Sequence, residues 1–239
     1  MTREARAVSV VPRWLWLALA AALGAQIGWN ASRPPAAAGG SDLPPAPRPE
    51  ALRLAAFGEA EAGARLAMLY LQSFDFGGAN TKPYRELDYG RLVDWLGAIL
   101  ALDPRSQYPL FSAARVYAEI PDAARSRQVL EFVYREFLRD PDRRWPWLAH
   151  GALLAKHRLH DLPLALRYAS AVEEKAASPD LPLWARQMRI FILEDMNELE
   201  AAKIMIRDLL LAGRISDPAE LRFLKERLEA LETRSPNVR

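Results

Sequence analysis

The pattern of hydrophobic and polar residues divides the chain into an apolar N-terminal segment, a proline-rich stretch and a long amphipathic region. Residues 14–32 (WLWLALAAALGAQIGWNAS) form a run of nineteen residues without a charge, between Arg13 and Arg33. A helix of that length is roughly 28 Å long, which just crosses the hydrocarbon core of a bilayer. We therefore predict a transmembrane helix, acting as a signal anchor, over residues 14–32.

The residues that flank this segment predict its orientation. Three arginines precede it, and an excess of positive charge marks the cytoplasmic side of a membrane. Trp14, Trp16 and Trp29 lie near its two ends, where tryptophan favours the membrane interface. We expect a single-pass protein of the bacterial inner membrane, with residues 1–13 in the cytoplasm and the C-terminal domain in the periplasm.

Two other interpretations of the apolar segment stay open. A secretory signal peptide has the same charged start and apolar stretch, and Ala22-Leu23-Gly24 fits the small residues of a cleavage site. Cleavage there would leave a soluble periplasmic protein. The segment could also be a helix buried in a protein core, although a proline-rich stretch follows it directly.

Residues 33–49 are rich in proline and alanine and contain almost no large apolar side chains. Such a stretch cannot bury enough surface to offset the entropy that it loses on ordering. We therefore expect an extended, semi-stiff linker that holds the following domain away from the bilayer.

From residue 50 to residue 234 the pattern is helical. Leu66, Leu69 and Tyr70, for example, share one face of a predicted helix. Alternating runs of β-branched residues and Asn-Gly hairpin signals are missing, so the region predicts an all-α domain. The predicted helices cover residues 50–74, 87–102, 107–119, 122–138, 145–158, 161–176, 181–195, 198–212 and 217–232.

Proline recurs at regular intervals through this region. Pro104, Pro141, Pro179 and Pro218 each follow a predicted helix, at steps of 37, 38 and 39 residues. Proline is favoured in the first turn of a helix and disfavours helix in the residue before it. Each unit is therefore predicted to be a proline-started helix, a short turn and a second helix. A second series of prolines keeps nearly the same step: Pro109, Pro146 and Pro182.

These units resemble tetratricopeptide repeats. HDLPLALRYASAVEEKAASPD is similar to the second half of such a repeat, with Ala165 and Ala169 where the paired helices cross. NELEAAKIMIRDLL, with Ala201 and Ala202, is similar again. The Trp-Leu-Gly-Tyr set that is usual in the first helix of a tetratricopeptide repeat is absent, and WPWLAHGALLA comes nearest to it. The step between units is also longer than the length of that repeat, about 34 residues. The resemblance covers roughly residues 104–216 and implies a right-handed α-solenoid of stacked antiparallel helix pairs.

Charge and composition exclude several classes of function. Residues 1–49 carry five arginines against two acidic residues, and the rest of the chain carries 27 basic and 28 acidic residues. The predicted domain is therefore nearly neutral, and we expect no nucleic-acid partner. The chain contains no cysteine, which excludes a disulfide framework, a cysteine-based zinc site and a cysteine nucleophile.

The three histidines are the main candidates for a metal site. His150 and His157 lie two helical turns apart, about 10 Å, too far to share an ion. His157 and His160 could converge with Asp161, but no HExxH-type signature accompanies them. We expect exposed polar residues there instead. Because catalytic motifs such as Gly-x-Ser-x-Gly are also missing, we predict a protein that is not an enzyme and holds no cofactor or metal.

The predicted function is a protein–protein interaction or scaffold module. Stacked helix pairs form a concave groove, lined by the first helix of each pair, that holds a peptide or a partner protein. Repeat phase places Trp147, His150, Arg186 and Arg189 on this groove. The stretch DPDRRWPW sets Arg143 and Arg144 beside two tryptophans, a frequent combination at interfaces. In the alternative interpretation the tryptophans join neighbouring repeats and the arginines face water.

The loop 73–89 is long for a connection between helices. Its aromatic residues, Phe74, Phe76, Tyr84 and Tyr89, either bind a partner, with Tyr84 as our candidate, or pin the loop to the first helices. A second functional hypothesis is a structural or assembly subunit of an inner-membrane or envelope complex that docks partly through residues 14–32. A metal-dependent enzyme is the third.

Overall fold

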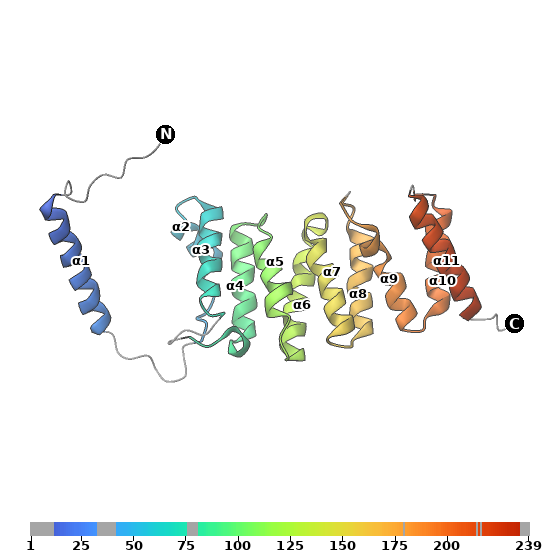
Figure 1. Ribbon diagram of the computed structural model, residues 1–239, viewed down its shortest axis with the longest axis horizontal. Coiled ribbons are helices and arrows are strands. Elements are labelled where there is room, and N and C mark those ends of the chain that lie inside the picture. The colour runs from blue at the N-terminus through green and yellow to red at the C-terminus, as the bar shows by residue number, and fades with distance from the viewer. Residues whose placement is uncertain are drawn as a thin grey trace.

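A computed structural model describes residues 12–32, 42–75, 81–178, 180–213, 215 and 217–234. All regular elements in these ranges are helices, which confirms the all-α prediction. Helices α2 to α11 stand side by side in one row that runs from the N-terminal to the C-terminal part of the chain (Figure 1). The helices are α1 (Arg13–Ala31), α2 (Pro49–Ala55), α3 (Ala60–Gln72), η2 (Tyr84–Glu86), α4 (Tyr89–Leu102), α5 (Tyr108–Ser112), η3 (Ala113–Tyr117), α6 (Ala123–Phe137), α7 (Pro141–His157), α8 (Leu162–Lys175), α9 (Leu183–Asp195), α10 (Leu199–Leu211) and α11 (Pro218–Arg234).

Helix α1 coincides with the predicted transmembrane segment. Every described side chain from Trp14 to Ser32 is exposed, although most of them are apolar. Among the described residues, no helix is both long enough and apolar enough to span a membrane. The membrane location of this segment stays a prediction.

Residues 42–48, which we call the strap, are packed against α4 instead of forming part of a free linker. Leu43 is fully buried and belongs to the main hydrophobic core. Its carbonyl oxygen accepts a hydrogen bond from Arg91 Nη1 at 2.8 Å, and the carbonyl oxygen of Pro44 accepts one from Trp95 Nε1 at 2.8 Å. The folded domain therefore includes residues 42–48, which composition assigned to the linker.

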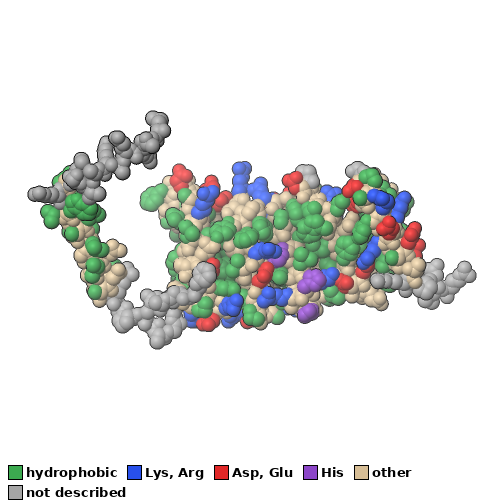
Figure 2. Space-filling view, viewed as in Figure 1, with side chains coloured by type: hydrophobic (Ala, Val, Ile, Leu, Met, Phe, Trp, Pro, Cys, Tyr) green, Lys and Arg blue, Asp and Glu red, His purple; other side chains and the backbone are tan. Residues whose placement is uncertain are grey.

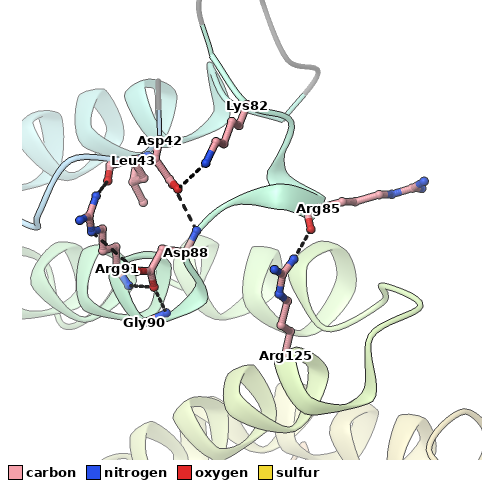
Figure 3. A network of polar contacts seen from close by, with 8 residues as sticks. All are labelled: Asp42, Leu43, Lys82, Arg85, Asp88, Gly90, Arg91 and Arg125. Atoms are coloured by element: carbon pink, nitrogen blue, oxygen red, sulfur yellow. Dashed lines mark hydrogen bonds and ion pairs between the residues drawn. The ribbon is translucent and has the colours of Figure 1, made fainter. Parts of the chain in front are cut away.

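Asp42 fixes the start of the strap (Figure 3). Its carboxylate accepts hydrogen bonds from the backbone N–H of Asp88 at 3.2 Å and from Lys82 Nζ at 3.1 Å. Partial burial raises the pKa of Asp42, but the hydrogen bonds from Asp88 and Lys82 outweigh it, so the pKa lies below its ordinary value. The strap is thus tied to the segment that enters α4.

The predicted helix 50–74 is wrong, because the chain breaks it into α2 and α3. Phe57 and Gly58 at the break have φ angles of 49° and 87°, in the left-handed region that ends helices. Glycine reaches this region without steric cost. The pattern of alanine, leucine and glutamate continues on both sides of Gly58, which explains why it predicted one helix.

The predicted start of the helix at 145–158 is also wrong. Helix α7 begins at Pro141, where the missing N–H costs nothing, and Pro146 lies inside the helix. In the next unit down the chain Pro182 directly precedes α9. The other predicted helices agree with the structure to within two residues at each end, with α5 and η3 together forming the one predicted at 107–119.

The core runs along the whole row. One cluster of buried residues extends from Leu43 to Ile192, and a smaller one joins α9, α10 and α11. Ala165, Ala169 and Ala202 are fully buried, as expected for small residues where helices cross. Small side chains there allow the close helix contacts on which the row depends.

Candidate protein-interaction surface

An aromatic surface lies across the first helices of three successive units. We call it the aromatic ridge and define it as Tyr108 and Phe111 of α5, Trp145 and Trp147 of α7, and Trp184 of α9. Four of these rings, together with parts of α7 and η3, line an open pocket of about 420 Å³. Figure 2 shows apolar side chains gathered over the middle of the row.

The rings of the ridge contact one another in two groups. Tyr108 stacks on Phe111 with centroids 6.2 Å apart, and Phe111 meets Trp147 edge to face at 5.6 Å. Trp145 and Trp184 meet edge to face at 6.1 Å, which bridges α7 and α9. Trp184 is 50% exposed. Such contacts hold the rings in fixed orientations and still leave their faces open to solvent.

The indole N–H groups of the ridge are used unequally. Trp147 Nε1 donates a hydrogen bond to Gln107 Oε1 at 2.6 Å. Trp145 and Trp184 donate none to any residue in the described ranges. The ridge therefore carries two donors to which the described part of the chain supplies no acceptor.

A polar edge borders the ridge at His150. Arg115 Nη1 lies 3.2 Å from His150 Nδ1, and His150 Nε2 lies 3.0 Å from Glu119 Oε1. Because arginine only donates, Nδ1 must accept, so the histidine is the neutral tautomer with its proton on Nε2. Burial lowers the pKa of His150 below its ordinary value; the hydrogen bond with Glu119 opposes this shift and the charge of Arg115 adds to it.

Arg115 is presented by a short π-helix, η3. The N–H of Ala118 bonds to the carbonyl of Ala113, five residues back, at 2.9 Å. Such π-helical turns are frequent at functional sites because they displace the side chains that follow. Arg115 is exposed, and no described carboxylate lies within 4.0 Å of it.

The structure brings together only two of the four residues that repeat phase placed on one groove. Trp147 and His150 line the same pocket. Arg189 instead points to α8, where it pairs with Glu173 at 3.4 Å and Glu174 at 3.7 Å. Arg186 lines a separate pocket with these two glutamates.

Arg143 and Arg144 have different roles. Arg144 is only 4% exposed and donates to the carbonyl and carboxylate oxygens of Glu136 at 2.7 and 2.9 Å, and to the carbonyl of Pro104 at 3.1 Å. Arg143 is exposed and pairs with Asp140 at 3.5 Å. Arg144 therefore joins helices inside the fold, which is incompatible with its predicted place on an interface.

The described aromatic residues of the loop 73–89 pack against the domain. Phe74 and Tyr89 are buried in the core, and Tyr84 is half-buried with its ring 6.0 Å from that of Tyr117. Phe76 lies outside the described residues. Of the two interpretations of this loop, the packing supports the one in which its aromatic residues pin it.

The histidines at the end of α7 and Asp161 belong to a helix boundary. Asp161 caps α8 by accepting from the N–H of Leu164 at 2.9 Å, and it also pairs with Arg127. His160 adopts a φ of 51° in the turn before it. Within the described ranges no three histidine, aspartate or glutamate side chains are grouped so that they could hold a metal ion.

Sequence reasoning missed Phe111, Trp184 and Arg115. A signal for the first two exists, because each lies two residues after a proline of the second series. Nothing in the sequence signals Arg115, whose position depends on the π-helix. No protein-family model, curated protein or solved structure matches the chain.

Proposed function

We propose that this protein is a membrane-anchored interaction module, facing the periplasm, whose aromatic ridge binds a partner protein. The observation that carries the proposal is the group of five aromatic side chains on one face, three of which are at least 40% exposed. Tryptophan, tyrosine and arginine dominate the binding energy of protein interfaces, usually from clusters of this kind. Soluble surfaces rarely gather so much apolar area without a use for it.

The proposed architecture is a right-handed, tetratricopeptide-like α-solenoid. Its support is the step of 36–39 residues between prolines and the row in which each helix packs mainly against its neighbours in sequence. In such arrays the first helices of successive units form a continuous binding face. The ridge, with residues from α5, α7 and α9, has this distribution.

The proposed anchor is α1. Its support is a run of exposed apolar side chains around the whole helix, with tryptophans near both ends and arginines before it. Exposed leucines at positions 17, 19 and 23 would be unfavourable in water and favourable in lipid.

Site-specific photo-cross-linking tests the binding face. A photoreactive phenylalanine analogue replaces Trp184 in the full chain, expressed in bacterial membranes. The matched control carries it at Leu138, an exposed apolar residue of the α6–α7 connection outside the ridge. We expect one defined adduct from position 184 that the control lacks and that the Phe111→Ala substitution reduces. Equal labelling from both positions would reject the ridge as the binding face.

The anchor is tested by the mature N-terminus and by replacement. Mass spectrometry of the purified protein should find residues 1–24 still attached, whereas a chain that starts near Ala25 would contradict the anchor. Exchange of residues 1–33 for an unrelated membrane helix should preserve the adduct at position 184. This outcome follows because the proposed partner contacts the ridge and not α1.

A second candidate, an assembly subunit that docks through α1, is favoured by one feature of that helix. Ala20, Gly24 and Gly28 follow one another at four-residue steps, and a side chain added at either glycine would meet nothing within 4 Å. Small residues at this spacing let transmembrane helices approach closely. If this candidate holds, Gly24→Leu with Gly28→Leu abolishes the adduct, whereas the interaction module keeps it.

A further inference from the structure

The strap shows how this fold holds a proline-rich segment. The segment Leu-Pro-Pro-Ala-Pro at 43–47 belongs to no helix or strand, and its prolines hold φ at about −65°. Arg48, which follows it, has φ and ψ of −63° and 144°, close to polyproline II. An indole N–H from Trp95 and a guanidinium from Arg91 donate to its carbonyl oxygens. Two donors of different types on one helix thus fix a backbone that has no internal hydrogen bonds.

The pocket at the aromatic ridge is lined by the same two types of donor, indoles and one guanidinium. The indole N–H groups of Trp145 and Trp184 donate to no described residue, and the rings contact each other. The guanidinium of Arg115, at the edge of the same pocket, contacts His150 and no described carboxylate. The residues that line the pocket thus include aromatic rings, two indoles whose N–H has no described acceptor, and one cation.

Free indole donors favour a polyproline II ligand over a helical one. The carbonyl groups along the side of an α-helix are engaged within the helix, whereas polyproline II leaves all of its carbonyls available. The rings of Trp145 on α7 and Trp184 on α9 have centroids 6.1 Å apart, less than the roughly 9 Å of one polyproline II turn, so one turn of ligand can contact both rings.

The charge of the ridge selects an acidic ligand. Arg115 supplies a positive charge, and no described aspartate or glutamate lines the pocket beside it. The protein's own proline-rich stretch has the wrong charge to complement it, because residues 33–49 contain two arginines and only Asp42, which is held by Lys82. The occupant is thus expected to come from another protein.

We infer that the aromatic ridge binds an acidic, proline-rich segment of a partner protein in the polyproline II conformation, with a carboxylate on Arg115. This inference rests on the proposed function and specifies its ligand. The backbone carbonyls of the segment accept from Trp145 and Trp184, and its proline rings lie on the aromatic faces. Recognition of this kind combines a stiff ligand with little entropy to lose and a wall of fixed rings.

Fluorescence anisotropy with defined peptides tests the inference on the full chain in detergent micelles. The probe is a labelled dodecapeptide of three Ala-Pro-Pro-Glu repeats. One control replaces each glutamate of the peptide with lysine, and the other is three Glu-Ala-Ala-Ala repeats, which favour a helix at the same charge. We expect the acidic proline-rich peptide to bind about tenfold or more tightly than the helical one, the difference that a lost hot spot makes.

Variants of the protein locate the binding. Trp184→Ala should lower the affinity for the probe peptide by about tenfold or more, whereas Leu138→Ala, outside the ridge, should leave that affinity unchanged. Trp184→Phe keeps an aromatic ring but lacks the N–H, so its affinity for the probe should lie between those of the unsubstituted protein and Trp184→Ala. Arg115→Glu should lower affinity for the acidic peptide by about two- to fivefold, the range of an exposed ion pair, and raise affinity for the lysine peptide.

Three results would overturn the inference: equal binding of the helical peptide, no effect of Trp184→Ala, or unchanged charge preference in Arg115→Glu. If the acidic probe fails to bind while photo-cross-linking at position 184 still gives its adduct, the inference falls and the proposed function stands. If an unlabelled peptide of residues 33–45 competes as well as the probe, the ligand is the linker of a second copy and the inference is also wrong.

Discussion

Replacing Arg144 with methionine is expected to destabilise the fold by about 3 kcal/mol, at the lower end of what breaking a buried ion pair costs. The guanidinium of Arg144 donates to the carbonyl and carboxylate of Glu136 and to the carbonyl of Pro104. It thereby connects the first turn of α7 to the last turn of α6 and to the α4–α5 connection. Methionine fills much of the same space and donates nothing.

The expected magnitude follows from what the change leaves behind. The carboxylate of Glu136 stays buried and keeps one ion pair in the described chain, with Arg139 at 2.5 Å, whose own side chain is 72% exposed. That remaining pair lowers the cost. The carbonyl of Glu136 loses a charged donor but keeps the backbone N–H of Arg139 at 3.2 Å, whereas the carbonyl of Pro104 loses the one donor that the described residues give it. A buried polar group without a partner costs about 1–3 kcal/mol. For a domain of this size 3 kcal/mol corresponds to roughly 6–12 °C in Tm.

Urea denaturation of the full chain in mild detergent, followed by circular dichroism at 222 nm, measures the effect. Arg143→Met is the matched control, because this side chain is 44% exposed and its pair with Asp140 should contribute less than about 1 kcal/mol. The double change Arg144→Met with Glu136→Leu should recover most of the loss, since both buried charges are then removed. Equal destabilisation by the two single changes would refute the reasoning.

Three further changes test other parts of the structure. Leu43→Ala, in the strap, should cost about 2–5 kcal/mol as a core truncation and speed hydrogen exchange of the Trp95 indole N–H, which donates to the strap at Pro44; an unchanged exchange rate would mean that Leu43 does not hold the strap. Gly58→Ala, at φ 87°, should lower the free energy of unfolding in urea by about 1 kcal/mol, whereas Gly97→Ala, inside α4 with room for a methyl group, should raise it by about 0.5–1 kcal/mol. Two changes of the same sign would contradict this reasoning. The pKa of His150 is lowered in the folded protein, whereas in the unfolded chain it is about 6.5, so on acidification this histidine takes up a proton in the unfolded chain first. The free energy of unfolding should therefore fall as pH decreases from 7 to 5, and His150→Gln should reduce that fall in urea titrations. An identical fall in the variant would exclude His150 as its source.

The helices were predictable because proline and apolar periodicity act locally. A proline in the first turn costs a helix no hydrogen bond and so favours a helix start, and most predicted ends lie within two residues of the observed ones. The errors in helix boundaries arise at proline and glycine, because either residue can lie at the end of a helix or within a helical stretch. Pro146 lies inside α7, which Pro141 starts, and Gly58 lies at the break between α2 and α3 in a sequence that otherwise favours helix.

The candidate site was less predictable because it depends on helix rotation. Arg186 and Arg189 were assigned to the groove by counting from Pro182 as if it were equivalent to Pro146. Pro146 lies well inside α7, whereas Pro182 precedes α9, so equal counts point in different directions. The strap was missed for another reason. The average composition of the stretch predicts a free linker, but Leu43 is buried in the core and holds the strap against the domain.

The strap also limits where a partner can meet the protein, if α1 is the anchor that we propose. From Ser32 to Asp42 the chain spans ten residues, which cannot reach farther than about 36 Å in any conformation. A linker free up to residue 49 would allow about 60 Å. The strap begins at the entry to α4, and the ridge starts in α5, the next helix along the row. Under this proposal the ridge would lie near the bilayer, and a partner that is itself held at the membrane would meet it more readily than one that diffuses freely.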